Sequence, residues 1–232
     1  MPLISLTGIT KTYDHMAVPV RALDGVTLEV MPGEFTAIVG PSGSGKTTLL
    51  NMIGGLDQPT AGTVVIDGID ISTMRKDDLI DFRLMHIGFV FQAYNLIPVL
   101  TAAENVEFIM LLQGVGKAER SSRTQELLEA VGLADRADTR PAQLSGGQQQ
   151  RIAVARALAS HPSFVLADEP TANLDTVSAM SLLDLMEQLN RENGMTFIFS
   201  THDARVIQRA HRVVTLEDGR VKSDLVNKDG HS

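Results

Sequence analysis

Short apolar runs alternate with helical patterns over most of the chain. Runs rich in β-branched and aromatic residues predict strands at residues 35–39, 63–67, 87–91, 164–167 and 196–200. A helix is expected over 46–54, where Gly54-Gly55 ends it. Near the end of the chain, residues 213–216 and 220–223 flank Glu217-Asp218-Gly219 and predict a closing hairpin. This alternation favours an α/β fold built on a sheet.

The stretch from residue 101 to about residue 160 has a different pattern. Its apolar residues recur at near-helical spacing, and it contains no convincing strand. Gly146-Gly147 opens a further helical stretch that carries Ile152, Ala155 and Leu158. We therefore expect a single domain over residues 1–232, in which a helical subdomain at 93–160 is inserted into a catalytic α/β core made of residues 1–92 and 161–232.

Composition narrows the class of partner. The chain has 232 residues, a formal net charge of −8 and no dense run of Lys or Arg, which argues against non-specific binding to nucleic acid. Cys is absent, so disulfides and thiolate metal sites are excluded. We predict no signal peptide and no membrane span, since the longest apolar candidate, 106–112, is short and contains Glu107. Residues 222–232 are polar and are expected to fray.

Residues 40–47 read GPSGSGKT, which fits the phosphate-binding motif G-x-x-x-x-G-K-[ST]. In such a loop, backbone N–H groups surround phosphate oxygens at a helix N-terminus. Lys46 is predicted to reach the β- and γ-phosphates, and Thr47 to bind Mg²⁺. A chance match is the alternative, and the preceding strand and following helix argue against it. The residues predicted to bind the nucleotide here are Gly40, Pro41, Ser42, Gly43, Ser44, Gly45, Lys46, Thr47 and Thr48.

The apolar strand at 164–167 ends in two carboxylates, Asp168 and Glu169. Ligands of open α/β sheets bind at the carboxyl ends of the strands. Asp168 is therefore placed to hold Mg²⁺, directly or through water. Glu169 is placed to orient or deprotonate an attacking water. The alternative, an acidic turn after a core strand, is weakened by the phosphate loop upstream.

Three single residues gain a role only in this context. His202 follows a predicted strand and is expected to approach the γ-phosphate, although a lone His at a strand end is more often structural. Gln92 follows strand 87–91 and is expected to contact Mg²⁺ or the attacking water; alone it is an ordinary loop glutamine. Tyr13 is one of two tyrosines and is expected to stack on adenine, worth about 1 kcal/mol, with ordinary packing as its alternative.

Residues 144–148 read LSGGQ, just before the helical stretch that follows. The Ser145 hydroxyl and the N–H groups of Gly146 and Gly147 form a second candidate grip for phosphate. If this grip and the phosphate loop sit at opposite ends of one lobe, it cannot fold back onto its own phosphate loop. A second copy of the chain would then supply the partner surface.

These motifs resemble the ATP-binding cassette (ABC) family of transporter ATPases over nearly the whole chain. The family's seven parts occur in order: Tyr13 (A-loop), 40–47 (Walker A), Gln92 (Q-loop), 144–148 (signature), 164–169 (Walker B), 172–175 (D-loop) and His202 (switch histidine). The resemblance implies a P-loop NTPase (RecA-like) core with an antiparallel β subdomain and an inserted α-helical signature subdomain. It also implies a head-to-tail homodimer holding two ATP and Mg²⁺, in which Ser145, Gly146, Gly147, Gln148 and Asp175 act across the interface. Catalysis would rest on Glu169, His202 and Gln92, and metal binding on Thr47, Gln92 and Asp168.

Softer cues point to a subgroup. Residues 20–23 (VRAL) after an extended loop from Asp14, residues 91–98 and the run LSGGQQQR at 144–151 resemble the subgroup of lipoprotein release, macrolide export and cell-division signalling. That subgroup implies integral membrane permeases as partners, and a peripheral position at the cytoplasmic face of the inner or plasma membrane. Residues 94–105 are the candidate docking surface, unless their apolar side chains pack the two lobes together. The rival class, a cassette ATPase acting on DNA or ribosomes, lacks the expected coiled coil or second cassette here.

Overall fold

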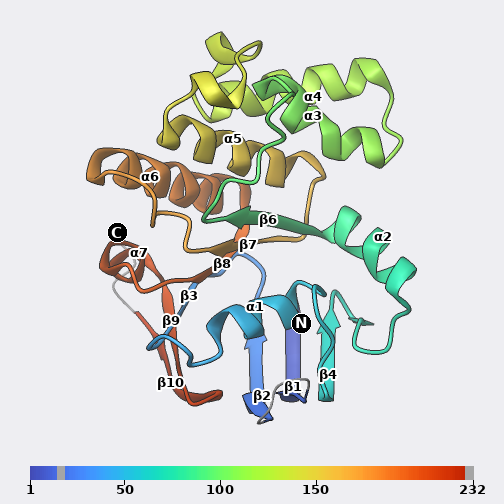
Figure 1. Cartoon of the computed structure of the whole chain (residues 1–232), viewed down its shortest axis with the longest axis vertical. Coiled ribbons are helices and arrows are strands. Elements are labelled where there is room, and N and C mark those ends of the chain that lie inside the picture. Colours follow the sequence, from blue (N-terminus) through green and yellow to red (C-terminus); the bar gives the residue numbers. More distant parts are fainter. Residues whose placement is uncertain (15–18, 228–232) are drawn as a thin grey trace.

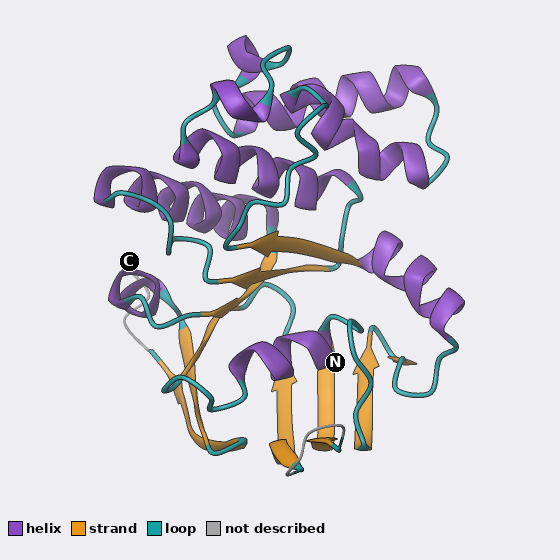
Figure 2. Ribbon diagram, viewed as in Figure 1, coloured by secondary structure: helices purple, strands orange, loops and turns teal. Residues whose placement is uncertain are grey.

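The computed structural model describes residues 1–14 and 19–227 (Figures 1 and 2). Its elements follow in chain order as β1 Ile4–Tyr13, β2 Val20–Val30, β3 Phe35–Val39, α1 Lys46–Ile53, β4 Ala61–Ile66, β5 Ile69–Asp70, α2 Lys76–His86, β6 Ile87–Phe91, α3 Ala102–Leu112, α4 Lys117–Ala130, η1 Ala134–Arg136, η2 Pro141–Gln143, α5 Gly146–Ala159, β7 Phe164–Asp168, α6 Thr176–Asn193, β8 Thr196–Ser200, α7 Ala204–Arg209, β9 Arg212–Glu217 and β10 Arg220–Val226.

Two sheets form the framework. The larger has six strands in the order β10-β9-β3-β8-β7-β6; its strands are parallel from β9 to β6, and β10 is antiparallel to β9. The smaller is antiparallel, in the order β2-β1-β4-β5. Helix α1 lies between the two sheets and contacts both, whereas α5 and α6 cover the other face of the larger sheet (Figure 1). The expected α/β class is therefore confirmed.

Alternate residues of the central strands pack into two hydrophobic cores, one on each face of the larger sheet. In β7, Val165 and Ala167 belong to the core shared with helices α3 to α6, which we call the helical-side core. Phe164 and Leu166 belong to the core shared with α1 and the smaller sheet, the β-side core. Side chains of a strand point to opposite faces in turn, so a sheet covered on both sides is apolar at every position.

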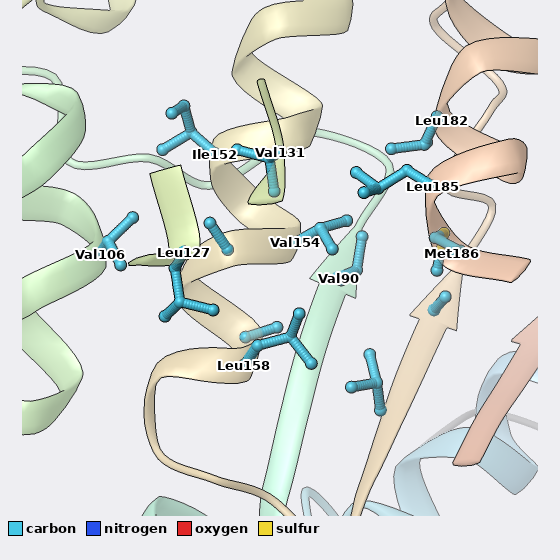
Figure 3. Close-up of a cluster of buried hydrophobic side chains, with 14 of the residues drawn as sticks. Val90, Val106, Leu127, Val131, Ile152, Val154, Leu158, Leu182, Leu185 and Met186 are labelled. Atoms are coloured by element: carbon cyan, nitrogen blue, oxygen red, sulfur yellow. The ribbon is translucent and has the colours of Figure 1, made fainter. Parts of the chain in front are cut away.

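Helices α3, α4 and α5 pack together above the larger sheet as the helical lobe (Figure 1). Figure 3 shows Val106 from α3, Leu127 from α4 and Ile152 and Leu158 from α5 within one apolar cluster. The N-termini of α3 and α5 are each closed by a capping box, Thr101 with Glu104 and Ser145 with Gln148. Such a box satisfies two backbone donors that a helix start leaves unpaired, so the signature residues also define where α5 begins.

Most of the expected elements are found, with small shifts at their ends. The strands at 87–91 and 196–200 are β6 and β8 as predicted, and strand 63–67 is β4, which begins two residues earlier at Ala61. The expectation that the chain frays from residue 222 is wrong up to residue 226, because β10 continues to Val226, paired with β9. Arg212 Nη2 also holds Asp224 Oδ2 at 2.6 Å. Residues 228–232, and residues 15–18 of the loop after Asp14, lie outside the described residues.

Candidate nucleotide-binding site

The predicted site residues follow strands whose ends are in register. Phe91 pairs with Asp168, Asp168 with Ser200, and Ser200 with Ile38, across β6, β7, β8 and β3. The residues that come next therefore leave the sheet along one edge. This places Gln92, Glu169, His202 and the phosphate loop side by side at the carboxyl ends of parallel strands.

The phosphate loop is held in its shape by its glycines and by crowding. Gly40, Gly43 and Gly45 have φ angles of +150°, +81° and +101°, which glycine adopts far more readily than other residues. A side chain at Gly40 would overlap the carbonyl oxygen of Leu216. Lys46 Nζ donates to the Gly40 and Pro41 carbonyl oxygens at 2.8 and 3.0 Å. The loop is thus a preformed curl at the start of α1, which is the geometry that binds phosphate.

Three buried side-chain oxygens at this edge have no hydrogen-bond partner among the described residues. They are Ser44 Oγ, within the loop, Asp168 Oδ1, at the end of β7, and Ser200 Oγ, at the end of β8. Unpaired buried oxygens are costly, so each is suited to a ligand. Thr47 is exposed in the first turn of α1. Its hydroxyl and the Asp168 carboxylate offer oxygen ligands, which Mg²⁺ prefers. These residues fit a nucleotide phosphate and its Mg²⁺.

The charge of Asp168 is disfavoured by its surroundings. Burial raises the pKa of Asp168, and the neighbouring Glu169 carboxylate adds to the rise, while the Ser200 hydroxyl and the Lys46 ammonium oppose it. A bound cation would favour the ionised form of this carboxylate.

Both carboxylate oxygens of Glu169 are fixed by the loop after β8. Glu169 Oε1 lies 2.6 Å from His202 Nδ1, and Glu169 Oε2 accepts from Thr201 Oγ1 at 3.1 Å. Glu169 also has a φ angle of +47°, a left-handed conformation that costs a non-glycine residue about 1 kcal/mol or more. Glu169 and His202, each predicted separately as catalytic, are therefore in contact, and the glutamate is oriented by its neighbours on a strained backbone.

The signature residues make their hydrogen bonds apart from the phosphate loop. Ser145 Oγ accepts from Gln148 N at 3.3 Å, and Gln148 Oε1 accepts from Ser145 N at 2.9 Å, within an exposed capping box. A Cβ at Gly147 would lie 2.9 Å from Ser178 Oγ, so α5 packs closely against the start of α6. Within the described part of the chain, no hydrogen bond joins residues 145–148 to the phosphate loop. The two predicted grips are not brought together in one copy.

Asp175 begins α6 in an exposed position. Its carboxylate accepts from Ser178 N at 3.0 Å and from Ser178 Oγ at 2.6 Å, which makes Asp175 the N-cap of that helix. A cavity of about 310 Å³ lies beside it and is shared by residues of α5 and α6, including Ser145, Gly147 and Ser178. The exposed starts of α5 and α6 thus form one polar surface.

Tyr13 lies beside the phosphate-loop helix in a cluster that the sequence did not predict. Its hydroxyl donates to Asp57 Oδ2 at 3.1 Å, and Lys11 Nζ lies 5.0 Å from the ring centroid while bonding Asp57 Oδ1 at 2.7 Å. Burial raises the pKa of Tyr13, and the hydrogen bond to Asp57 adds to the rise. The ring is oriented by these partners, and its predicted stacking on adenine stays a prediction.

The loop after β6 contacts both ends of α5 and the segment that precedes α6. Asn173 Nδ2 donates to the Gln92 carbonyl oxygen at 3.0 Å, while the Gln92 side chain is exposed. Arg156 of α5 donates to the Tyr94 and Asn95 carbonyl oxygens at 2.9 and 2.5 Å. A Cβ at Gly146 would lie 2.7 Å from Tyr94 Oη. Gln92, the signature and residues 172–175 are therefore mechanically connected, through partners that no local sequence pattern reveals.

An apolar groove of about 430 Å³ opens between the two lobes. It lies between α2 and β6 on one side and α3 and α5 on the other, and its lining includes Ile80, Leu84, Phe89, Ile109, Leu112 and Arg156. Of the predicted docking segment 94–105, Asn95 lines the groove, Leu96 packs against the helical-side core and Val99 is 71% exposed.

Among the described residues, no helix is long and apolar enough to cross a membrane.

Comparison with known proteins identifies the family. The sequence profile described as "ABC transporter" matches residues 23–172. An uncharacterized ABC transporter ATP-binding protein of Thermotoga maritima is 50% identical over 220 residues, covering 95% of this chain and 94% of that protein. The macrolide export ATP-binding/permease protein MacB of Brucella abortus is 47% identical over 231 residues. That match spans 100% of this chain but only 36% of that protein.

A solved structure supports the same assignment. The ATP-binding cassette MJ0796, described as a dimer in a post-hydrolysis state bound to ADP and Pi, has a TM-score of 0.88 and 44% identity, covering 96% of this chain and 98% of that chain. Together with the preformed phosphate loop and the strand-end carboxylates, these matches show that the chain is an ATP-binding, ATP-hydrolysing protein of the ABC transporter family.

Proposed function

We propose that two copies of this chain bind two ATP head to tail, and that ATP binding and hydrolysis drive an integral membrane permease. Among the described residues, the phosphate loop and the exposed signature share no hydrogen bond in one copy, which supports a partner copy that supplies the signature. Ser145 and the Gly147 N–H would then contact the γ-phosphate of the partner's nucleotide, and Asp175 would lie at the interface.

The chemistry we propose uses the arrangement at the strand ends. Lys46 and the loop N–H groups bind the β- and γ-phosphates, and Tyr13 stacks on the adenine. Thr47, Asp168 and Gln92 would hold Mg²⁺, which would neutralise charge on the phosphates. Glu169 accepts a proton from the attacking water, and His202, at 2.6 Å from its carboxylate, keeps it oriented. Phosphoryl transfer needs mainly positioning and charge neutralisation, and these residues supply both.

The observation that carries the coupling proposal is the apolar groove between the lobes. Three of its apolar residues are about half-exposed, on a surface that also contains Arg156: Leu56 at 47%, Ile80 at 51% and Leu112 at 55%. Met85, at 52%, lies on helix α2 like Ile80 but does not line the groove. A groove of this kind takes the apolar face of a partner helix. Because Arg156 also holds the loop after Gln92, a helix in the groove would act directly on that loop.

The finer proposal concerns the type of system. We propose an exporter or lipoprotein-release complex in which the chain sits at the cytoplasmic face of the membrane, bound to a permease that transmits force. The MacB relative, whose name combines an ATP-binding part with a permease, supports this assignment. Cell-division signalling by the same kind of complex is an alternative within this type of system. Action on DNA or ribosomes is the alternative that the test below separates.

Two neighbouring leucines of α3 provide the test. Leu112 lines the groove, while Leu111 is similarly exposed, at 51% against 55%, and does not line it. Glu169→Gln should keep ATP affinity, lower turnover at least about 100-fold and give an ATP-dependent dimer in light scattering. Tagged Glu169→Gln is then used with ATP to recover partners from solubilised membranes, alone and combined with Leu112→Glu or Leu111→Glu.

We expect Leu112→Glu to lower the recovered permease at least about tenfold, since a charge in an apolar groove is costly, while Leu111→Glu recovers it as the parent does. A permease with four transmembrane helices and a large external domain supports force transmission. Equal loss with both leucine variants would overturn the groove assignment. A Glu169→Gln variant that stays monomeric with saturating ATP would overturn the head-to-tail dimer. Recovery of ribosomal or DNA-bound proteins alone would overturn the transporter assignment.

A further inference from the structure

A buried hydroxyl connects the segment after Glu169 to the loop of the switch histidine. Thr171 is fully buried, at 0% exposure, and its Oγ1 donates to Asp203 Oδ2 at 2.6 Å. The two residues are 32 positions apart. A hydrogen bond from a hydroxyl to a carboxylate is short and stronger than a neutral one. The contact therefore ties the start of the D-loop (residues 172–175) to the residue that follows His202.

Asp203 is also held by Arg205, which bonds both of its carboxylate oxygens. Arg205 Nε lies 3.0 Å from both carboxylate oxygens, and Nη2 lies 2.6 Å from Oδ2. Asp203 Oδ1 also accepts from Arg205 N at 2.9 Å, as the N-cap of α7. Arg205 holds the pKa of Asp203 well down, to about 2, and nearby Asp175 contributes to the raised pKa of Arg205. The charge of Arg205 is thus favoured both by Asp203 and by the residue at the end of the D-loop.

The same loop holds the catalytic carboxylate. Asp203 N donates to Thr201 Oγ1 at 3.0 Å, and Thr201 Oγ1 donates to Glu169 Oε2 at 3.1 Å. His202, between these two residues, contacts Glu169 Oε1 at 2.6 Å. A displacement of Asp203 would therefore move both groups that orient Glu169. Thr171 lies only two residues after Glu169 in the chain, and this second path returns from Thr171 to the Glu169 carboxylate through hydrogen bonds and the loop of residues 201–203.

We propose that Thr171, Asp203 and Arg205 form a positioning unit that makes the orientation of Glu169 depend on the position of the D-loop. None of the three touches the reacting atoms; they act through Thr201 and His202. The inference rests on the catalytic roles proposed above for Glu169 and His202. It adds a regulatory consequence: a change at the D-loop, where a second copy would dock, reaches the catalytic carboxylate through Thr171.

Thr171 gives a near-isosteric test. Thr171→Val keeps the shape and removes the hydroxyl, and Thr171→Ser keeps the hydroxyl. We expect Thr171→Val to lower kcat about tenfold with KM for ATP within about twofold, because nucleotide binding does not use this contact. Thr171→Ser should restore at least about half of the parent kcat. The assay is steady-state ATP hydrolysis by the full chain, with the thermal unfolding midpoint recorded for each variant.

Arg205 gives the second test, with Arg209 as its matched control. Arg209 lies on the same helix α7 and bonds Asp184 and Glu187 at 2.6 and 3.1 Å, so it also makes charged contacts but lies outside the unit. We expect Arg205→Gln to lower kcat about threefold and Arg209→Gln to leave it within about twofold. Thr171 and Arg205 act through one carboxylate. The kcat of the double variant Thr171→Val with Arg205→Gln should therefore fall by less than about 30-fold, which is the product of the two single losses.

The outcomes separate cleanly. A Thr171→Ser variant as slow as Thr171→Val would show that packing matters instead of the hydroxyl, and would overturn the unit. So would a Thr171→Val variant with unchanged kcat, a matching rise in KM, or fully multiplicative losses in the double variant. Glu169→Gln, assayed alongside, tests the underlying catalytic role: its retained turnover would refute that role, whatever the Thr171 variants do.

Discussion

The two segments that we propose to bind phosphate are held in place by different physical means. The phosphate loop lies between the two sheets, with left-handed glycines and a backbone that leaves no room for a side chain at Gly40. The signature lies on the surface and is closed by the capping box of Ser145 and Gln148. The first segment is fixed by backbone geometry and crowding, the second by two side-chain hydrogen bonds at a helix start.

The difference suggests a division of labour. A segment that must bind nucleotide in every state of the cycle gains from being preformed, because preorganisation lowers the cost of binding. A segment that meets its ligand only when two copies close needs to be exposed and complete on its own. Substitutions in the phosphate loop should therefore act mainly by distorting its backbone. Substitutions in the signature should act mainly by changing the charge or hydrogen bonding that it presents to the partner's nucleotide.

The largest effect should come from Gly40→Ala. The new Cβ would overlap the Leu216 carbonyl oxygen at a φ angle of +150°, so the loop must distort. We expect ATP affinity to fall at least about 100-fold, since overpacking and left-handed strain together cost about 3 kcal/mol. Isothermal titration calorimetry with ATP measures it. Gly43→Ala is the control: at φ +81° it has no heavy atom within 4 Å of the new Cβ, so it should lose much less. Equal losses would mean that crowding is not what shapes the loop.

A smaller and different effect should follow from Ser145→Asp. Aspartate is as good an N-cap as serine, so the free energy of unfolding should change by less than about 0.5 kcal/mol. Its charge would repel the phosphates of the partner's nucleotide, so we expect kcat to fall about 30-fold with the ATP affinity of the monomer kept within about twofold. Kinetics and calorimetry on the same preparation give both numbers. Weakened nucleotide binding by the monomer would refute the assignment of Ser145 to the partner's site.

The smallest expected effect is on the pH dependence of the free energy of unfolding. It distinguishes the Asp203–Arg205 ion pair from the uncharged capping box of Ser145. The pKa of Asp203 is lowered from 3.8 to about 2 by Arg205. A lowered pKa in the folded state stabilises the fold above pH 3.8, and that stabilisation is lost as the pH falls from 3.8 towards about 2. Allowing for solvent screening, we expect the free energy of unfolding of Arg205→Gln to be about 1 kcal/mol lower than that of the parent at pH 7.

Urea unfolding of the parent and of Arg205→Gln at several pH values measures this difference. The gap in the free energy of unfolding should be constant from pH 7 to about pH 5 and should narrow as the pH approaches 3.8 and falls further. Ser145→Ala, which removes an uncharged cap worth about 1 kcal/mol, should show a gap that does not change with pH. A gap that widens in acid for Arg205→Gln would contradict the assigned ion pair.

What the sequence revealed about the site follows from how local each feature is. The phosphate loop and the strand-end residues Asp168, Glu169 and His202 were predictable because glycine spacing and apolar strands encode them within a few positions. The contact of Thr171 with Asp203 spans 32 positions, and that of Asn173 with Gln92 spans 81, so no local pattern announces them. They could be seen only once the fold had brought the loops together.

The same reasoning explains the elements that the pattern missed or shortened. Helix α2 has only two buried residues, Leu79 and Phe82, too few to give a clear helical period. Strand β10 has an exposed outer face and looked like a polar tail. It is ordered to Val226 because its backbone pairs with β9 and because Arg212 joins Asp224 to Glu34. In both cases the structure comes from partners far away in the sequence.

The groove between the lobes has a mechanical consequence, because it follows the seam between the two cores. Its wall on one side includes Ile87 and Phe89, which belong to or pack on the β-side core, and on the other Ala157, which belongs to the helical-side core. Close-packed protein interiors transmit strain instead of absorbing it. A rigid helix bound in this groove would push the two sides apart. A small rotation of the helical lobe against the larger sheet would then give a larger displacement at the exposed signature.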